Sequence, residues 1–238
     1  MKQRFSLLHL DSLPLQYDDG GVRTACSSGS GGQMLPLSLR QAGRCAAQHE
    51  MGHFVAGKAL GFRTGSVSLK IDLMGHTASA EVRLAEPIAD LDALRSYLSR
   101  RIMVLMAGSI GETLDHAKHD KPVDRAAAQK ILMVKGFGAE DDFSKCRELI
   151  RVLRNVTLLS TNPLDGAAVE AECAKIFEDL WAQAAALIER NATAVCCLAS
   201  ALVDDAVAGE LRKMSEEFLN SLPGVREIAC LVPAESPL

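Results

Sequence analysis

The sequence predicts a mainly α-helical protein with one small β-hairpin. From residue 91 onward, apolar residues recur at spacings of three and four, which is the period of an amphipathic helix. Residues 66–84 instead alternate apolar and polar side chains, a pattern typical of two paired strands. Aromatic residues make up only 4% of the 238 residues. The core must therefore come from aliphatic residues, of which Leu, Ala and Met favour helices.

Composition divides the chain into three segments. Residues 1–35 are expected to be a flexible lead, because the stretch CSSGSGG at residues 26–32 offers nothing to bury. Residues 36–222 form the expected folded domain. Residues 223–238 contain three prolines and are expected to be a flexible tail.

The first elements follow from local signals. Ser38 and Gln41 have the spacing of a capping box, so a helix should begin there. It should run to about Leu60, where Gly61 supplies a stop. Two strands at residues 66–71 and 77–84 then form the hairpin around a turn at residues 72–75. The remaining helices are expected at about residues 91–114, 124–134, 142–159, 164–187, 194–203 and 209–219.

The first helix carries the motif HEMGH, from His49 to His53. Two histidines four residues apart lie on one face of a helix, so both imidazoles can bind one zinc ion. Glu50 follows the first histidine, where its carboxylate can take a proton from a metal-bound water. The motif therefore predicts a zinc (Zn2+) hydrolase with Glu50 as the catalytic base. The alternative is a helix whose two histidines bind no metal.

Two sets of small residues predict a close helix contact. Gly52 lies inside the first helix, where glycine costs about 1 kcal/mol relative to alanine and should have a packing reason. Residues 107–109, Ala-Gly-Ser, are equally small and lie on a later helix. We expect these two surfaces to let the helices approach closely.

A catalytic zinc takes three protein ligands and a water, so a third ligand must come from elsewhere. The extended motif, with a further histidine six residues after the second, is missing, and Gly57 and Leu60 do not provide it. Candidates in the sequence are Glu112, Asp115, His116, His119, Asp120 and Asp124. Glu112 could instead hold a ligand histidine by its second ring nitrogen.

The ordered motifs resemble the peptidase domain of the FtsH-type zinc metalloproteases. The resemblance rests on HEMGHFVAGKAL from His49, on Gly75-His76-Thr77 in the hairpin and on MAGSIGE ending at Glu112. It covers residues 38–220 and is nearer to the ATPase-less FtsH-like zinc proteases of plants. It implies a helical, zincin-like metallopeptidase domain.

The resemblance also implies a third ligand. The family uses an aspartate at the start of a helix that ends before a Gly-Phe-like turn, which points to Asp124, with Asp120 next. The family's Asn before this aspartate is Val123 here, and its Thr/Gly-rich approach is replaced by residues 116–122.

The implied function is zinc-dependent hydrolysis of peptide bonds in unfolded or loosely folded polypeptides. The sequence has no P-loop ATPase module and no membrane anchor. The expected partners are therefore a polypeptide substrate and either further copies of the chain or a separate ATPase. An extended substrate is expected to add to the edge of the first hairpin strand, residues 66–71. The alternative is a non-catalytic helical scaffold or assembly partner that keeps the peptidase fold.

The net charge and the cysteines indicate which partners and which cellular compartment to expect. The net charge of −4 and the lack of basic runs argue against nucleic-acid binding. No apolar stretch is long enough for an integral membrane segment. Seven irregularly spaced cysteines fit a reducing compartment. We therefore expect an intracellular, soluble protein, with the cytoplasm or an organelle such as the plastid as the compartment.

Overall fold

The computed structural model describes residues 36–230, except residues 85, 160–161, 163 and 205. The expected flexible lead and residues 231–238 of the expected tail lie outside the described residues. The described elements are, in chain order, α1 (Leu37–Ala59), β1 (Arg63–Asp72), β2 (Gly75–Arg83), α2 (Leu91–Glu112), α3 (Arg125–Met133), α4 (Glu140–Thr157), α5 (Gly166–Arg190), α6 (Ala192–Val203), β3 (Leu211–Met214), α7 (Glu216–Ser221) and α8 (Pro223–Arg226).

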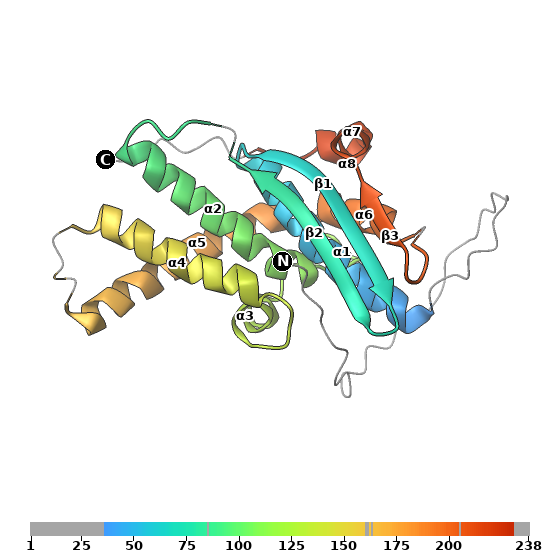
Figure 1. Ribbon diagram of the computed structural model, residues 1–238, viewed down its shortest axis with the longest axis horizontal. Coiled ribbons are helices and arrows are strands. Elements are labelled where there is room, and N and C mark those ends of the chain that lie inside the picture. The colour runs from blue at the N-terminus through green and yellow to red at the C-terminus, as the bar shows by residue number, and fades with distance from the viewer. Residues whose placement is uncertain (1–35, 85, 160–161, 163, 205, 231–238) are drawn as a thin grey trace.

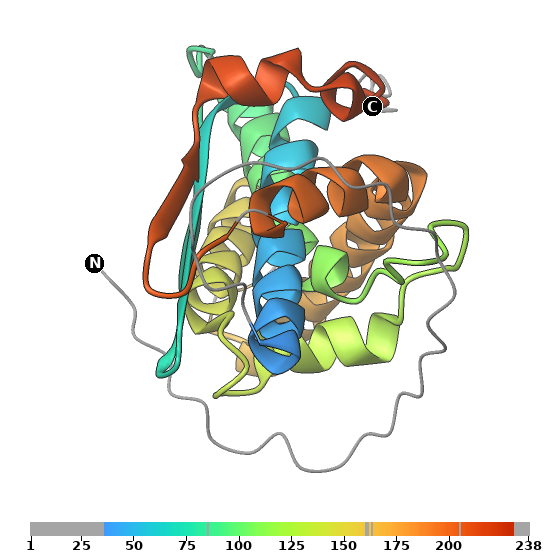
Figure 2. The ribbon, with the colours of Figure 1, turned by 90° about the vertical axis from the view of Figure 1, so that its right-hand side faces the viewer.

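The protein is mainly α-helical with one small antiparallel sheet, as the sequence predicts. Helix α1 runs through the middle, with the sheet on one side and α6 and α5 on the other (Figures 1 and 2). Helix α2 packs along α1, and α4 packs along α2 (Figure 1). The core is mostly aliphatic, and the aromatic residues buried in it among the described residues are Phe54, Phe62 and Trp181. Phe54 is fully buried on α1 with Met51. Because α1 is enclosed by its neighbours, its two motif histidines are also held within the protein.

The sheet has three strands in the order β2-β1-β3. The predicted hairpin is confirmed, with Asp72 pairing with Gly75 at the turn. Beyond the hairpin, β3 pairs antiparallel with β1, so that Val67 lies opposite Met214. The helix expected at residues 209–219 is therefore wrong in its first half, and only α7 remains helical. The expectation that β1 offers a free edge is wrong for the same reason, because both of its edges are paired.

Helices α1 and α2 touch through glycine, as predicted. A Cβ added at Gly52 would overlap the backbone carbonyl oxygen of Ala107 on α2. A Cβ added at Gly111 would lie 2.7 Å from the carbonyl oxygen of Gln48 on α1. Only hydrogen fits at these two positions, so the small residues allow backbone-to-backbone contact. This contact sets the distance between the motif helix and the helix that carries Glu112.

The ends of the helices agree only in part with the sequence signals. Gly61 has φ +78°, which confirms the stop after α1. The capping box is not formed, because α1 begins one residue before Ser38 and Pro36 is its N-cap. Residues 223–226, which the sequence analysis assigned to the flexible tail, form α8, and α8 packs against α6.

Across the described residues, no single helix combines the length and the apolar character that a membrane crossing requires. Only α5 and α6 taken together pass that test, and they are bent by 69° relative to each other. Both helices bury much of their apolar surface inside the protein, including Leu187 and Leu198.

Candidate metal centre

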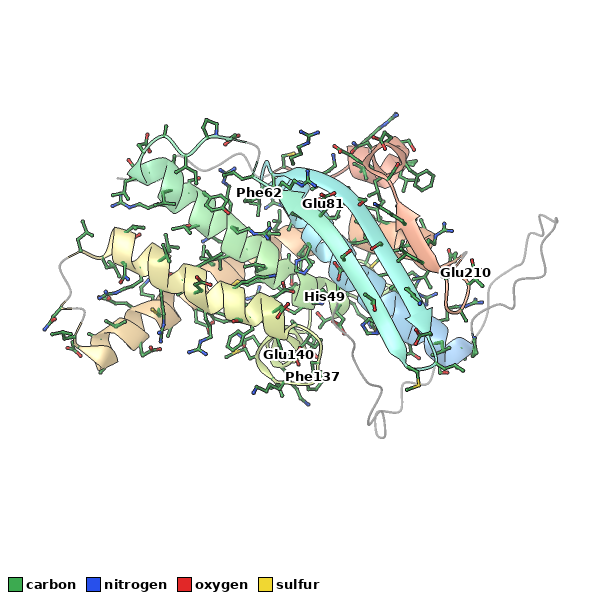
Figure 3. All side chains as sticks on the ribbon, in the orientation of Figure 1. His49, Phe62, Glu81, Phe137, Glu140 and Glu210 are labelled. Atoms are coloured by element: carbon green, nitrogen blue, oxygen red, sulfur yellow. The ribbon has the colours of Figure 1, made fainter. Side chains whose placement is uncertain are left out.

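His49 and His53 lie one helical turn apart on α1, with their ring centroids 4.8 Å from each other. Both residues are buried, each with 9% of its surface exposed. The helical period alone predicts this pairing, since residues i and i+4 share a face. The packing of α1 against its neighbours then turns that face toward α2 and α4 (Figure 3).

The third residue of the cluster is Asp142, in the first turn of α4. Its Oδ2 lies 3.2 Å from Nε2 of His49 and 3.1 Å from Nε2 of His53. One ligand atom from each of the three residues lies within 4.8 Å of the others. Donor atoms on a tetrahedral zinc with bonds of about 2.1 Å lie roughly 3.3 Å apart. The spacing of these atoms therefore fits a zinc ion bound by two histidines and one aspartate.

The second nitrogen of each imidazole is also held. Nδ1 of His53 donates to the carbonyl oxygen of Val104 over 2.7 Å. Nδ1 of His49 lies 3.2 Å from Oε2 of Glu112 and donates to that carboxylate. Metal-binding histidines commonly have such an outer partner, which fixes the ring and leaves the other nitrogen for the metal. Both Nε2 atoms accordingly point to the same place, and Glu112 has the position that the sequence analysis expected.

The electrostatics of the cluster couple the imidazoles to the carboxylates. Burial alone would lower the pKa of His49, but hydrogen bonds to Asp142 and Glu112 outweigh it and raise this pKa well above its usual value. Burial alone would raise the pKa of Asp142, but the neighbouring charges of His53 and His49 hold it well below its usual range. Asp142 is therefore a carboxylate at neutral pH, as a metal ligand has to be.

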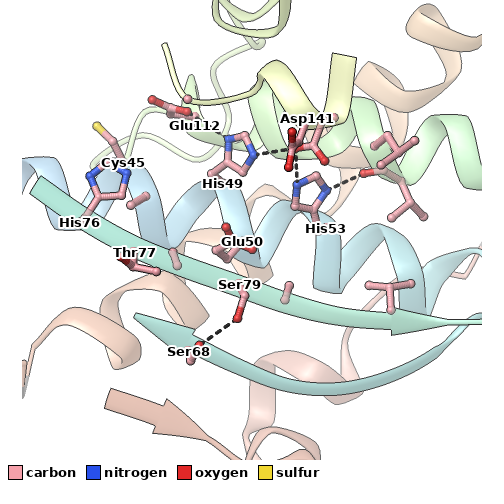
Figure 4. A pocket seen from close by; sticks show the side chains of 18 of the residues that line it. Cys45, His49, Glu50, His53, Ser68, His76, Thr77, Ser79, Glu112 and Asp141 are labelled. Carbon is pink, nitrogen blue, oxygen red and sulfur yellow. Dashed lines mark hydrogen bonds and ion pairs between the residues drawn. The ribbon is translucent and has the colours of Figure 1, made fainter. Parts of the chain in front are cut away.

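Glu50 lies in the same cleft, on the side of β2. Figure 4 shows its carboxylate between His49 and the strand, whereas Glu112 lies on the other side of the His49 ring. Burial raises the pKa of Glu50, and the charges of His53 and His49 oppose this increase. The backbone amide of Ala80 on β2 faces the Glu50 carboxylate and also opposes the increase in its pKa. Glu50 is thus beside the metal-ligand cluster without belonging to it.

The cleft around this cluster has a volume of about 550 Å³. It is bounded by α1, by β2, and by α2 and the start of α4. Within the sheet of described strands, β2 pairs only with β1, so its other edge borders the cleft. The amide of Ala80 faces Glu50, so it points into the cleft. Amides of alternate residues in a strand point the same way, so the amide of Ala78 does too.

Gly108 on α2 lies directly above the two histidines. A Cβ added at Gly108 would lie 2.5 Å from Nε2 of His53 and 2.6 Å from Nε2 of His49. No side chain fits there without displacing the ring nitrogens. The glycine therefore leaves room for whatever the two Nε2 atoms bind.

Asp124, which the sequence analysis favoured as the third ligand, is not part of the cluster. It is exposed, and its side chain accepts a hydrogen bond from the amide of Ala127, so it is the N-cap of α3. Asp120 is exposed in the loop before α3. His116 and His119 are in the same loop, where Nε2 of His119 lies 3.0 Å from the carbonyl oxygen of His116. None of these four side chains joins the described metal-ligand group.

The sequence did contain a signal for Asp142. The helix at residues 142–159 was expected, and Asp142 stands at its predicted start, just after Gly136 and Gly138. Both glycines have positive φ, +93° and +96°, and they turn the chain back from α3 so that α4 begins at the histidines. An aspartate at a helix start usually caps the helix. Whether it is instead a metal ligand depends on which helix meets α1.

The chain matches no protein-family model and no curated protein. The resemblance to the FtsH-type peptidases therefore rests on the motifs alone.

Proposed function

We propose that this protein is a zinc-dependent endopeptidase that hydrolyses extended segments of unfolded polypeptides. One observation carries the proposal: the ligand atoms of His49, His53 and Asp142 converge on one point of a cleft that also holds Glu50. Two histidines and a carboxylate leave one position of a tetrahedral zinc open, which is the arrangement of catalytic rather than structural sites. A zinc ion bound here would polarise a peptide carbonyl and lower the pKa of its water.

Glu50 has the position of the catalytic base. It neighbours the ligand His49 in sequence and faces the cleft, so its carboxylate can take a proton from a water between it and the cluster. Burial favours the protonated form of Glu50, whereas a divalent cation beside it would favour the carboxylate. The same group can then return the proton to the amine of the leaving peptide.

The free edge of β2 is suited to hold a peptide substrate. An extended chain can add to an exposed strand edge through backbone hydrogen bonds, which do not depend on its sequence. The amides of Ala78 and Ala80 face the cleft, and Ala80 lies next to Glu50. A chain bound along β2 would therefore pass its backbone carbonyls close to the cluster. A folded protein cannot offer such a segment, so unfolded polypeptides are the expected substrates.

The family's features divide between the two aspartates, because the helix that ends before the Gly-Phe turn starts at Asp124. The family's aspartate stands at a helix start and follows an asparagine. Asp142 stands in the first turn of α4 and follows Asp141, which has the shape of asparagine. Asp124 follows Val123, which does not. A glycine-containing approach also precedes Asp142, at residues 136–138.

Cleavage of casein, an unfolded protein, tests the proposal. The purified, zinc-loaded protein is compared with Glu50→Gln, which removes the base and leaves all three ligands. We expect the parent to cut casein and the variant to lose at least 100-fold in rate, the upper range for loss of a general base being about 10⁴-fold. Zinc content, measured by atomic absorption, should be equal in the two proteins.

The same assay also tests the alternative function, that of a non-catalytic helical scaffold. If neither protein cuts casein although both hold zinc, the helical scaffold becomes the better proposal, or a partner such as a separate ATPase is required. If the parent cuts casein but not a tightly folded substrate added beside it, a partner ATPase is needed to unfold folded substrates.

Zinc binding should release protons. Zinc binds the neutral imidazole, but Asp142 and Glu112 raise the pKa of His49 well above its usual value and so keep a proton on it at neutral pH. Binding must displace that proton, so we expect release of about one proton per zinc at pH 7. Apparent zinc affinity should fall as the pH falls. Calorimetry in two buffers of different ionisation enthalpy measures the release, and equal enthalpies in both buffers would contradict the prediction.

A further inference from the structure

Two basic side chains line the metal cleft at one end. Arg101 on α2 and Lys145 on α4 both border it. Neither forms a salt bridge with any carboxylate of the described chain. Several other cations of these two helices are paired, such as Arg95 with Asp92 and Arg151 with Glu170. The cleft therefore holds two positive charges that form no salt bridge with a described residue, beside the carboxylates of Glu50, Glu112, Asp141 and Asp142 that also line it.

The contacts along α2 show which end this is. Glu112 contacts His49, and the carbonyl oxygen of Val104 contacts His53, so α2 passes the two histidines in reverse chain order. Arg101 lies almost one turn beyond Val104, on the far side of His53 from His49. The exposed carboxylate Asp141 also lines the cleft, one turn before Lys145 on the same face of α4 and nearer to the N-terminus of that helix.

Helix α4 brings Lys145 to the same end. Arg95 on α2 donates to the carbonyl oxygen of Val156 on α4, so the N-terminal part of α2 meets the C-terminal part of α4 and the helices are antiparallel. Lys145 therefore lies nearer to Arg101 along the helices than Asp142 does. Both cations lie at the His53 end of the cleft, whereas Glu112 lies at the His49 end.

Strand β2 follows the same axis. Figure 4 shows His76 beyond His49 on the side away from His53, so the start of β2 lies at the His49 end. At the other end, a Cβ added to Gly57 would lie 3.0 Å from Cγ1 of Val82. A peptide bound along β2 therefore passes the cations near Val82 and leaves the cleft near His76.

Because Arg101 and Lys145 both lie at the Val82 end of β2, we infer that the cleft selects polypeptide segments with an acidic residue on the N-terminal side of the scissile bond. Antiparallel addition to β2 is the more stable pairing, and it places the N-terminal half of the substrate at the Val82 end. At about 3.3 Å per residue, Arg101 and Lys145 would meet a side chain roughly two to three residues before the scissile bond. This inference rests on the proposed peptide groove and adds the class of residue that it prefers.

Peptide binding tests this without relying on catalysis. The probes are labelled, end-capped alanine-serine peptides that carry two glutamates, two lysines or two glutamines at the same positions. Their Kd is measured by fluorescence anisotropy with zinc-loaded Glu50→Gln. At low ionic strength we expect the glutamate peptide to bind about tenfold tighter than the lysine peptide, and this ratio should shrink as salt is added.

Charge reversal supplies the matched comparison. In the Glu50→Gln background, Arg101→Glu with Lys145→Glu should remove or invert the preference. Lys118→Glu with Arg125→Glu makes the same change in net charge at exposed residues outside the cleft, and it should leave the preference intact. Circular dichroism checks that both variants fold. Equal affinity for the three peptides, or a preference that survives reversal in the cleft, would overturn the inference.

Different results would contradict the endopeptidase proposal and the acidic preference of the groove. If the parent cuts no peptide but the charge preference is present and sensitive to reversal, the endopeptidase proposal fails and the acid-selective groove stands. If the parent cuts, the cleavage sites in casein, read by mass spectrometry, should carry Asp or Glu within about three residues on the N-terminal side. Cleavage sites without that enrichment would overturn the acidic preference alone.

Discussion

Replacing Asp142 with alanine is expected to lower the affinity for zinc by more than about 100-fold, whereas Asp124→Ala should leave it unchanged. Loss of an outer partner of a metal ligand costs roughly 10- to 100-fold in affinity, and loss of a direct ligand should cost more. Oδ2 of Asp142 is within 3.2 Å of both Nε2 atoms, while Asp124 only caps α3. Competition with a chromogenic zinc chelator measures both affinities.

Thermal unfolding provides the control for this pair. Asp124→Ala removes a helix N-cap, which typically costs about 1 kcal/mol, so it should lower the Tm and keep the zinc. Asp142→Ala should instead lose the zinc while the protein remains folded. If Asp124→Ala loses zinc and Asp142→Ala keeps it, the ligand set proposed from the structure is wrong.

The second large effect is expected at Gly108. A Cβ at this position would lie 2.5 Å from Nε2 of His53 and 2.6 Å from Nε2 of His49, so Gly108→Ala must displace the atoms that would bind zinc. We expect zinc affinity to fall at least tenfold, because His53 is held from behind by Val104 and cannot simply retreat. The same chelator competition measures the loss.

Substitutions at two other glycines distinguish a loss of zinc affinity from a general loss of stability. In Gly52→Ala the added Cβ meets the Ala107 carbonyl, so the variant should force α1 and α2 apart and destabilise the fold by about 1–3 kcal/mol. Gly166→Ala, at the start of α5, meets no atom within 4 Å, so it should leave zinc affinity unchanged and should not lower the Tm. A Gly108→Ala protein that binds zinc as tightly as the parent would show that the two Nε2 atoms are not the ligand atoms.

Local periodicity determined much of this protein from the sequence. A separation of four residues on a helix is enough to place His49 beside His53, whatever the rest of the fold does. Alternation with period two was likewise enough for β1 and β2. The contact between α1 and α2 was predictable because Gly52 and Gly108 are costly in helices and need a packing reason. Strand β3 was missed, because its four residues are too few to show a period.

The third member of the metal cluster was decided only by the tertiary structure. Asp124 and Asp142 have the same local appearance, since each stands at the beginning of a helix, and a local signal cannot separate a cap from a ligand. Asp142 is 89 residues from His53 along the chain. It arrives there because the turn at Gly136 and Gly138 reverses the chain and α4 packs along α2. Secondary structure depends on neighbouring residues, whereas a metal site depends on which distant helix ends are packed together.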